Sequence, residues 1–147
     1  MPTLIFESVL PCSPTKLWEF HASAEALAKL TPPDRKIQLL SEDLEVRQGA
    51  VHTMRVRQYG IWMLWVAKIT TVEPPNRFCD VAEKSPFKKW EHCHEFLPHE
   101  NGALLRDFVT YELPFGVLGR LVDWLFVRRS IENLFHYRHA KTREILG

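Results

Sequence analysis

Six short β-type runs follow one another between Ile37 and Val109, and this series constrains the fold more than any other feature of the sequence. Turn residues separate the runs at the regular spacing of a meander. They are Gln48-Gly49, Tyr59-Gly60, Pro74-Pro75-Asn76 and Glu100-Asn101-Gly102. The series therefore predicts six antiparallel strands.

The segments on either side of this series predict one more strand and three helices. Thr3–Leu10 alternates as a strand does, until a proline that cannot donate to a ladder ends it. Ser13-Pro14 is typical of the start of a short helix, and a second short helix is expected over Ser23–Leu30. Val117–Leu146 has apolar residues at helical spacing and predicts one long helix.

This order of elements predicts the α+β class. A sheet of six or seven strands does not stay flat, so we expect it to curl and the long helix to close its open side. The space between helix and sheet is where a ligand site is expected. The chain has 147 residues and shows no repeat or linker, so a single domain over residues 1–147 is expected.

Composition excludes several classes of function. Nineteen basic and eighteen acidic residues give a net charge of +1, which does not favour nucleic acid as a partner. The most apolar run, Ile61–Ala67, is shorter than the roughly 20 residues of a spanning helix, and the N-terminus lacks a signal-peptide pattern. The three cysteines, Cys12, Cys79 and Cys93, form no CxxC pair. Their odd number favours reduced thiols and a cytoplasmic location over a disulfide framework.

The turn at His99–Gly102 predicts the register of the last two strands. On one face the predicted pairs are Trp90 with Tyr111, His92 with Val109, His94 with Asp107 and Phe96 with Leu105. On the other face Glu95 opposes Arg106 and Lys89 opposes Glu112, which is typical of a solvated surface. The aromatic and histidine face is therefore expected inside, and Cys93 outside without assigned reactivity.

The Tyr59-Gly60 turn predicts a second inward set by the same reasoning. Its members are His52, Met54, Val56, Met63, Trp65, Ala67 and Ile69, extended through the prolines of the next turn to Phe78 and Asp80. Buried ionisable groups are costly unless paired or hydrated. Several of them on one apolar face therefore indicate a wet pocket rather than a sealed core.

Three stretches of the sequence resemble a known superfamily. They contain Phe20-His21 with Leu30-Thr31-Pro32-Pro33, Pro86-Phe87 with Trp90-x-His92-x-His94-x-Phe96, and Asp107 with Tyr111-x-Leu113-Pro114-x-Gly116. They resemble the SRPBCC superfamily of START-like or Bet v-type domains, particularly its bacterial polyketide cyclase/dehydrase-like branch. The resemblance covers nearly the whole chain. It implies a helix-grip fold around a hydrophobic cavity and carries over no catalytic residue.

His92-x-His94 with Asp107 allows sharper hypotheses. Two imidazoles on one face of a strand, with a carboxylate on the neighbouring strand, are an arrangement that metal sites use. We favour instead hydrogen bonds from the histidines to Asp107, Tyr111 and water, and we expect no metal and no cofactor. The same three residues are the only candidates for general acid or base catalysis. His21 is expected to pack or to cap its helix.

The long helix is apolar around too much of its circumference near Leu121–Val127 for one sheet contact. A homodimer contact, a lid, or shallow docking on a lipid surface beside Arg128-Arg129 would each cover the extra face. Burial by the two short helices and the Pro32-Pro33 loop is the alternative.

The leading hypothesis is non-enzymatic binding or carriage of a hydrophobic small molecule in the internal cavity. One alternative is a cyclase, dehydratase or isomerase with a cavity histidine as acid or base, and another is a protein-interaction domain that uses Trp124. The predicted ligand-binding residues are His52, Met54, Trp65, Phe78, Asp80, Trp90, His92, His94, Phe96, Asp107, Tyr111, Trp124 and Arg128.

Overall fold

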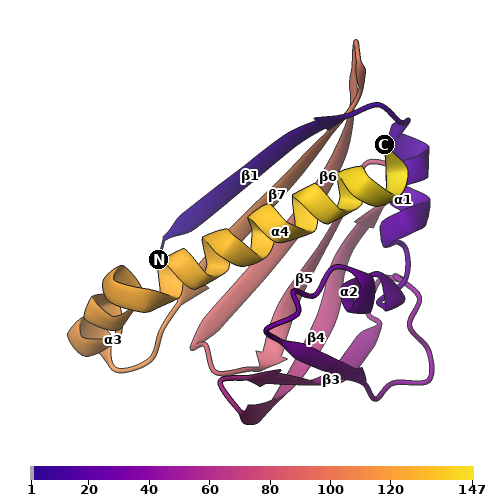
Figure 1. The fold of residues 1–147 in the computed structure, drawn as a ribbon. Helices are drawn as coiled ribbons and strands as arrows, with labels where there is room; N and C mark the ends of the chain where they lie inside the picture. Colours follow the sequence, from indigo (N-terminus) through magenta and orange to yellow (C-terminus); the bar gives the residue numbers. More distant parts are fainter. Residues whose placement is uncertain (1) are drawn as a thin grey trace.

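A seven-stranded antiparallel sheet forms the body of the protein in the computed structural model, which describes residues 2–147 (Figure 1). The sheet order is β1-β7-β6-β5-β4-β3-β2. The strands are β1 (Thr3–Leu10), β2 (Lys36–Leu39), β3 (Val51–Gln58), β4 (Ile61–Glu73), β5 (Arg77–Lys84), β6 (Lys89–His99) and β7 (Gly102–Glu112). The expected α+β class, with six strands after the short helices, is confirmed.

The short helices lie between β1 and β2. They are α1 (Pro14–His21) and α2 (Glu25–Lys29). Ser13 caps α1 as its sequence predicts, because its hydroxyl accepts a hydrogen bond from the backbone N–H of Lys16. The helix α2 is shorter than the predicted Ser23–Leu30.

The C-terminal helical segment runs along the sheet but is not one uniform helix. It consists of α3 (Gly116–Val122), a π-helical turn η1 (Asp123–Val127) and α4 (Arg128–Leu146). Figure 1 shows α4 running across one face of the curved sheet. Within residues 2–147, no helix is both long and apolar enough to span a membrane.

The predicted strand registers of the two main hairpins are confirmed. Trp90 pairs with Tyr111 and His94 with Asp107 across β6 and β7, and Met54 pairs with Trp65 across β3 and β4. Asp80 also lies inside, opposite Ile69, through a feature that the sequence did not reveal. A bulge at Thr70 shifts the register between β4 and β5, and this shift brings both Ile69 and Asp80 to the inner face.

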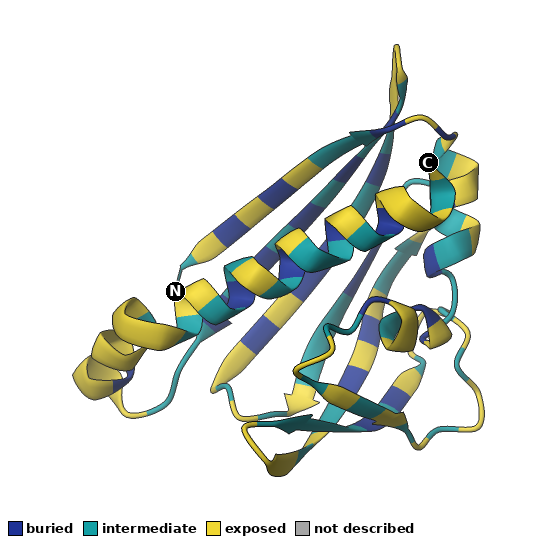
Figure 2. Ribbon diagram, in the orientation of Figure 1, coloured by how far each residue is buried: buried dark blue, intermediate teal, exposed yellow. Residues whose placement is uncertain are grey.

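Two apolar clusters hold the helices on the sheet. One packs Leu17 of α1 against Phe96, Leu105 and other residues of the sheet, and the other packs Ile131 and Phe135 of α4 against β1, β6 and β7. Phe6 stacks on Phe135 with ring centroids 4.9 Å apart. Buried residues accordingly line the sheet side of α4, while α3 is almost entirely exposed (Figure 2).

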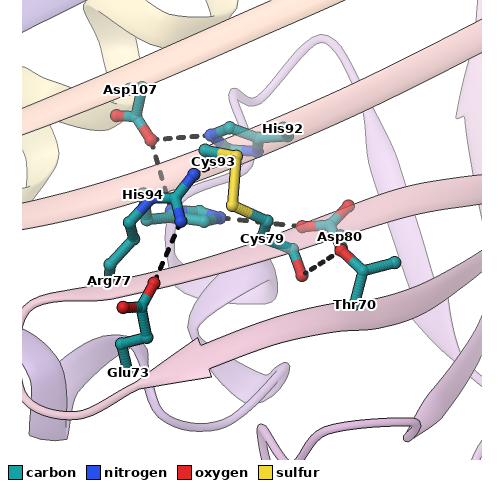
Figure 3. The surroundings of a disulfide bond; sticks show 9 residues. All are labelled: Thr70, Glu73, Arg77, Cys79, Asp80, His92, Cys93, His94 and Asp107. Carbon is teal, nitrogen blue, oxygen red and sulfur yellow. Dashed lines mark hydrogen bonds and ion pairs between the residues drawn. A yellow bond between two sulfur atoms is a disulfide. The ribbon is translucent and has the colours of Figure 1, made fainter.

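The expectation that all cysteines stay reduced is wrong for two of them. Cys79 on β5 and Cys93 on β6 are directly opposite one another and form a disulfide on the outer face of the sheet (Figure 3). Both are buried. Only Cys12 remains free among the three cysteines. The odd number of cysteines was misleading, because the register of β5 and β6 brings two of the three thiols together whatever their total number.

Candidate functional site

A cavity of about 380 Å³ lies between the concave face of the sheet and the helices. Its wall contains nine of the predicted ligand-binding residues. They are His52, Met54, Trp65, Phe78, Asp80, Trp90, His92, His94 and Asp107. Most of the other lining side chains are apolar, including Ile69 from the sheet and Leu134 and Phe135 from α4.

Four residues of the predicted set do not line this cavity. Phe96 and Tyr111 are fully buried behind it, and the Tyr111 hydroxyl donates a hydrogen bond to Asp123 over 2.5 Å. Trp124 is 77% exposed and Arg128 is exposed beside Glu132. The π-helical turn explains these two errors, because its extra residue per turn rotates Asp123 and Val127 inward and leaves Trp124 and Arg128 outside.

The carboxylate of Asp107 is the centre of the polar part of the site (Figure 3). His92 donates from Nε2 to its Oδ1 over 2.6 Å, and Nδ1 of His94 lies 3.2 Å from the same oxygen. His139 of α4 donates from Nε2 to Oδ2, also over 2.6 Å, and its Nδ1 lies 2.8 Å from the Ser8 hydroxyl. One buried carboxylate is therefore surrounded by three imidazoles from β6 and α4.

This arrangement shifts the titration of its members. Burial alone would raise the pKa of Asp107, but the hydrogen bonds from His139, His92 and His94 hold it well below its ordinary value of 3.8. Burial, together with the neighbouring His94, lowers the pKa of His92. Burial also acts against the charged form of His94, yet Asp107 and Asp80 outweigh it and raise its pKa. His94 therefore holds a proton more tightly than an ordinary histidine does.

The same groups are the candidate metal ligands. Asp80, His92 and His94 each place one donor atom within 4.8 Å of the others. Oxygen and imidazole donors suit zinc and related divalent ions. The two histidines already direct one ring nitrogen each to Asp107, so hydrogen bonding accounts for their orientation.

Two further histidines line the cavity in structural roles. His21, at the end of α1, donates from Nδ1 to the backbone carbonyl of Leu17 over 2.8 Å, as its predicted packing or capping role requires. Burial and the adjacent His94 lower its pKa to about 4. His52 donates from Nε2 to the Glu45 carbonyl. Neither side chain is bonded to Asp107.

Sequence reasoning missed several polar residues of the site, among them two arginines and a histidine. Arg35 and Arg138 line the cavity, and His139 completes the shell around Asp107. A signal for His139 was present, because it follows Ile131 and Phe135 at intervals of four on the buried side of α4. No local pattern marked Arg35, which precedes the short β2 strand.

The outer face of α3 and η1 has no partner within residues 2–147. Its exposed apolar residues are Phe115, Val117, Leu118, Leu121, Val122, Trp124, Leu125 and Phe126. The alternative that the short helices and the Pro32-Pro33 loop bury this face is wrong. Phe126 also lines the cavity, so the face continues to its mouth. We call it the α3 face.

A curved antiparallel sheet that holds a long C-terminal helix over a cavity defines the helix-grip fold. The family model of polyketide cyclase/dehydrase and lipid transport proteins matches residues 10–135. The chain belongs to this family, and its resemblance to the SRPBCC superfamily is thereby confirmed.

Solved structures show the same fold at low sequence identity. Protein CV1439 from Chromobacterium violaceum is 15% identical with a TM-score of 0.78, covering 99% of this chain and 98% of its own. TTHA0849 from Thermus thermophilus is 21% identical with a TM-score of 0.71, covering 97% and 95%. Ara h 8.0201 is 15% identical with a TM-score of 0.63, covering 95% of both chains. A comparison with curated proteins found no match.

Proposed function

We propose that the protein binds or carries a hydrophobic small molecule in the cavity without transforming it. The observation that carries this proposal is the cavity itself. Its volume of about 380 Å³ lies in the range of small-molecule sites, roughly 300–1,000 Å³. Its walls are mainly apolar. They include the indole rings of Trp65 and Trp90, which meet edge to face with their centroids 5.3 Å apart.

Four of the polar groups lie together at one part of the wall. His92, His94, Asp80 and Asp107 are on neighbouring strands, so a ligand meets them together, beside the aromatic side chains of the sheet. A few placed polar groups are sufficient to orient a ligand. We therefore assign them to orientation, with Trp65, Phe78 and Trp90 as apolar wall.

Fluorescence of N-phenyl-1-naphthylamine, an uncharged apolar dye, tests this function. The protein is expected to bind the dye, and Ala67→Phe, which adds a ring inside the cavity, is expected to weaken binding at least tenfold. Lys68→Phe is the matched control, because Lys68 is the next residue of β4 and is exposed on the other face. Native mass spectrometry of gently purified protein identifies any co-purifying molecule. Equal dye binding by the two variants would contradict the proposal.

An enzyme is the second candidate, and the pKa of His94 favours it. A histidine whose pKa is raised by Asp107 and Asp80 holds its proton more tightly than an ordinary histidine, and at the cavity wall it is a candidate general acid. A cyclase, dehydratase or isomerase reaction would use it with His92. Turnover that is lost in folded His92→Ala and His94→Ala variants supports this candidate, and unchanged turnover removes it.

The α3 face is proposed as the site where the protein docks on a lipid surface to exchange its ligand. Arg120, Arg128 and Arg129 are exposed on or beside this face, whereas Asp123 is engaged by Tyr111. Apolar side chains flanked by arginines suit an anionic lipid surface. Continuity with the cavity through Phe126 gives the ligand a short route.

A further inference from the structure

Two arginines line the cavity beside its apolar walls. Arg35 precedes β2, and Arg138 lies on α4. Their Nε atoms are both buried without a hydrogen-bond partner, and no other buried side-chain nitrogen or oxygen in residues 2–147 lacks one. An unsatisfied buried donor carries a desolvation penalty, which is larger when the group is charged. The chain itself therefore leaves both guanidinium groups incompletely hydrogen-bonded.

Hydrogen bonds from one end of its guanidinium group hold Arg35 in place. Its Nη2 donates to the Ser130 hydroxyl over 2.7 Å and to the Ser130 carbonyl over 3.2 Å. Ser130 lies on α4 and also lines the cavity. These bonds fix the guanidinium at the cavity wall while its Nε remains unused.

Arg138 is less engaged than Arg35. Within the described chain no hydrogen bond or ion pair reaches its guanidinium, whose Cζ lies 5.0 Å from the ring centre of Phe135. Because Phe135 is three residues earlier in α4, the side chain leans toward the start of the helix, the direction of Ser130 and Arg35. Burial lowers the pKa of Arg138 to about 10, so the group is still charged at neutral pH.

The carboxylates of the cavity favour the charged form of Arg138 from a distance but do not contact either arginine. Asp107 directs both oxygens to imidazoles, and Asp80 lies 3.8 Å from Nε2 of His94. Neither forms an ion pair with Arg35 or Arg138 among residues 2–147. The two guanidinium groups thus lie at the cavity wall with their Nε atoms buried and without a carboxylate in direct contact.

We propose that the ligand is an amphipathic organic carboxylate whose head group is bound by Arg35 and Arg138 and whose apolar body occupies the aromatic part of the cavity. This inference rests on the proposed binding function and names its ligand class. A guanidinium matches a carboxylate in planarity and donor spacing, and such charge-assisted hydrogen bonds are the strong ones. The terminal amino groups of Arg138, which line the cavity and have no hydrogen bond or ion pair within residues 2–147, are the donors that the head group satisfies.

Competition by two probes with alkyl chains of equal length tests the inference. Decanoate and decanol are each used to displace N-phenyl-1-naphthylamine from the protein. Because hydrogen bonds to charged groups are worth about 1.5–3 kcal/mol, decanoate is expected to bind at least about tenfold more tightly than decanol. Equal affinities for the two probes, or displacement of the dye by neither, would overturn the inference. The proposed function would remain intact in that case, because the dye is still bound. Failure of the dye to bind at all would overturn both.

Variants then assign the preference to the arginines. Arg138→Met is expected to remove the preference for decanoate over decanol, and Arg138→Lys, which keeps the charge, is expected to retain part of it. Arg129→Met is the matched control, because Arg129 is exposed on the same helix. Circular dichroism confirms that each variant is folded. An unaltered preference in Arg138→Met would overturn the assignment.

Discussion

The Asp107 carboxylate on β7 accepts a hydrogen bond from Nε2 of His139 on α4 over 2.6 Å, and both side chains are buried. This contact joins the long helix to the middle of the sheet. Ser8 extends it to the edge strand β1 through Nδ1 of the same imidazole. The polar network of the cavity is consequently also part of what holds the fold together.

Asp107→Asn is expected to destabilise the protein by about 3 kcal/mol, because a buried ion pair loses one partner and an amide nitrogen cannot accept from an imidazole. Urea unfolding at neutral pH measures the change. The pKa of Asp107 is lowered in the folded state, so its contribution is present above pH 3.8 and is lost as the pH falls through the folded value. Glu100→Gln, at an exposed turn, is the control. An Asp107→Asn protein as stable as its parent would be inconsistent with the network.

His21 is expected to make stability fall as the pH decreases from 6.5 to about 4. Its imidazole has a pKa of about 4 in the folded protein against 6.5 unfolded, so the unfolded chain binds the proton first. The difference between these two pKa values corresponds to about 3 kcal/mol. His21→Asn, whose amide also donates, is expected to flatten this decline in unfolding free energy, whereas exposed His99→Asn leaves it unchanged. Parallel pH profiles for His21→Asn and the parent would refute the assignment.

The Cys79–Cys93 disulfide predicts a thiol count and a stability change. Unfolded, unreduced protein is expected to show one reactive thiol, from Cys12, and three after reduction. The bridge closes a short loop, so its loss in Cys79→Ser with Cys93→Ser is expected to cost about 3 kcal/mol of unfolding free energy. Three thiols before reduction would show that the bridge does not form.

Trp124→Ser is expected to weaken binding to anionic lipid vesicles at least tenfold, because burying an aromatic side chain contributes about 2 kcal/mol. Co-sedimentation with phosphatidylcholine vesicles that contain phosphatidylglycerol measures it, and high salt should also weaken it. Ile5→Ser, at an exposed position of β1, is the control. A dimer in solution that dissociates in Trp124→Ser would assign the α3 face to a second copy of the chain instead.

Strand register was the part of the site that the sequence could predict. Short turns fix which residues share a face, so His92, His94 and Asp107 were expected together and lie together. The same reasoning applied to β5 and β6 would have found the disulfide, because Asp80 opposite His92 places Cys79 opposite Cys93. The bulge at Thr70 left no local signal, since it arises from pairing between distant segments.

The helical part of the site was predicted less well because periodicity assumes a uniform helix. The π-helical turn changes the residues per turn, so the inward positions before Arg128 are Asp123 and Val127 rather than Trp124. After the turn, regular α-helical spacing returns and Ile131, Phe135 and His139 face the sheet. Arg138 and Arg35 depend on tertiary packing and could not be placed from local sequence.

The edge contact between Trp65 and Trp90 has a spectroscopic consequence. Both indoles border the cavity, so an occupant changes the polarity around two of the five tryptophans. Their intrinsic emission should therefore shift in wavelength and intensity on loading, without any label, while Trp124 in solvent contributes a constant background. The unmodified protein thus supplies its own optical reporter of occupancy.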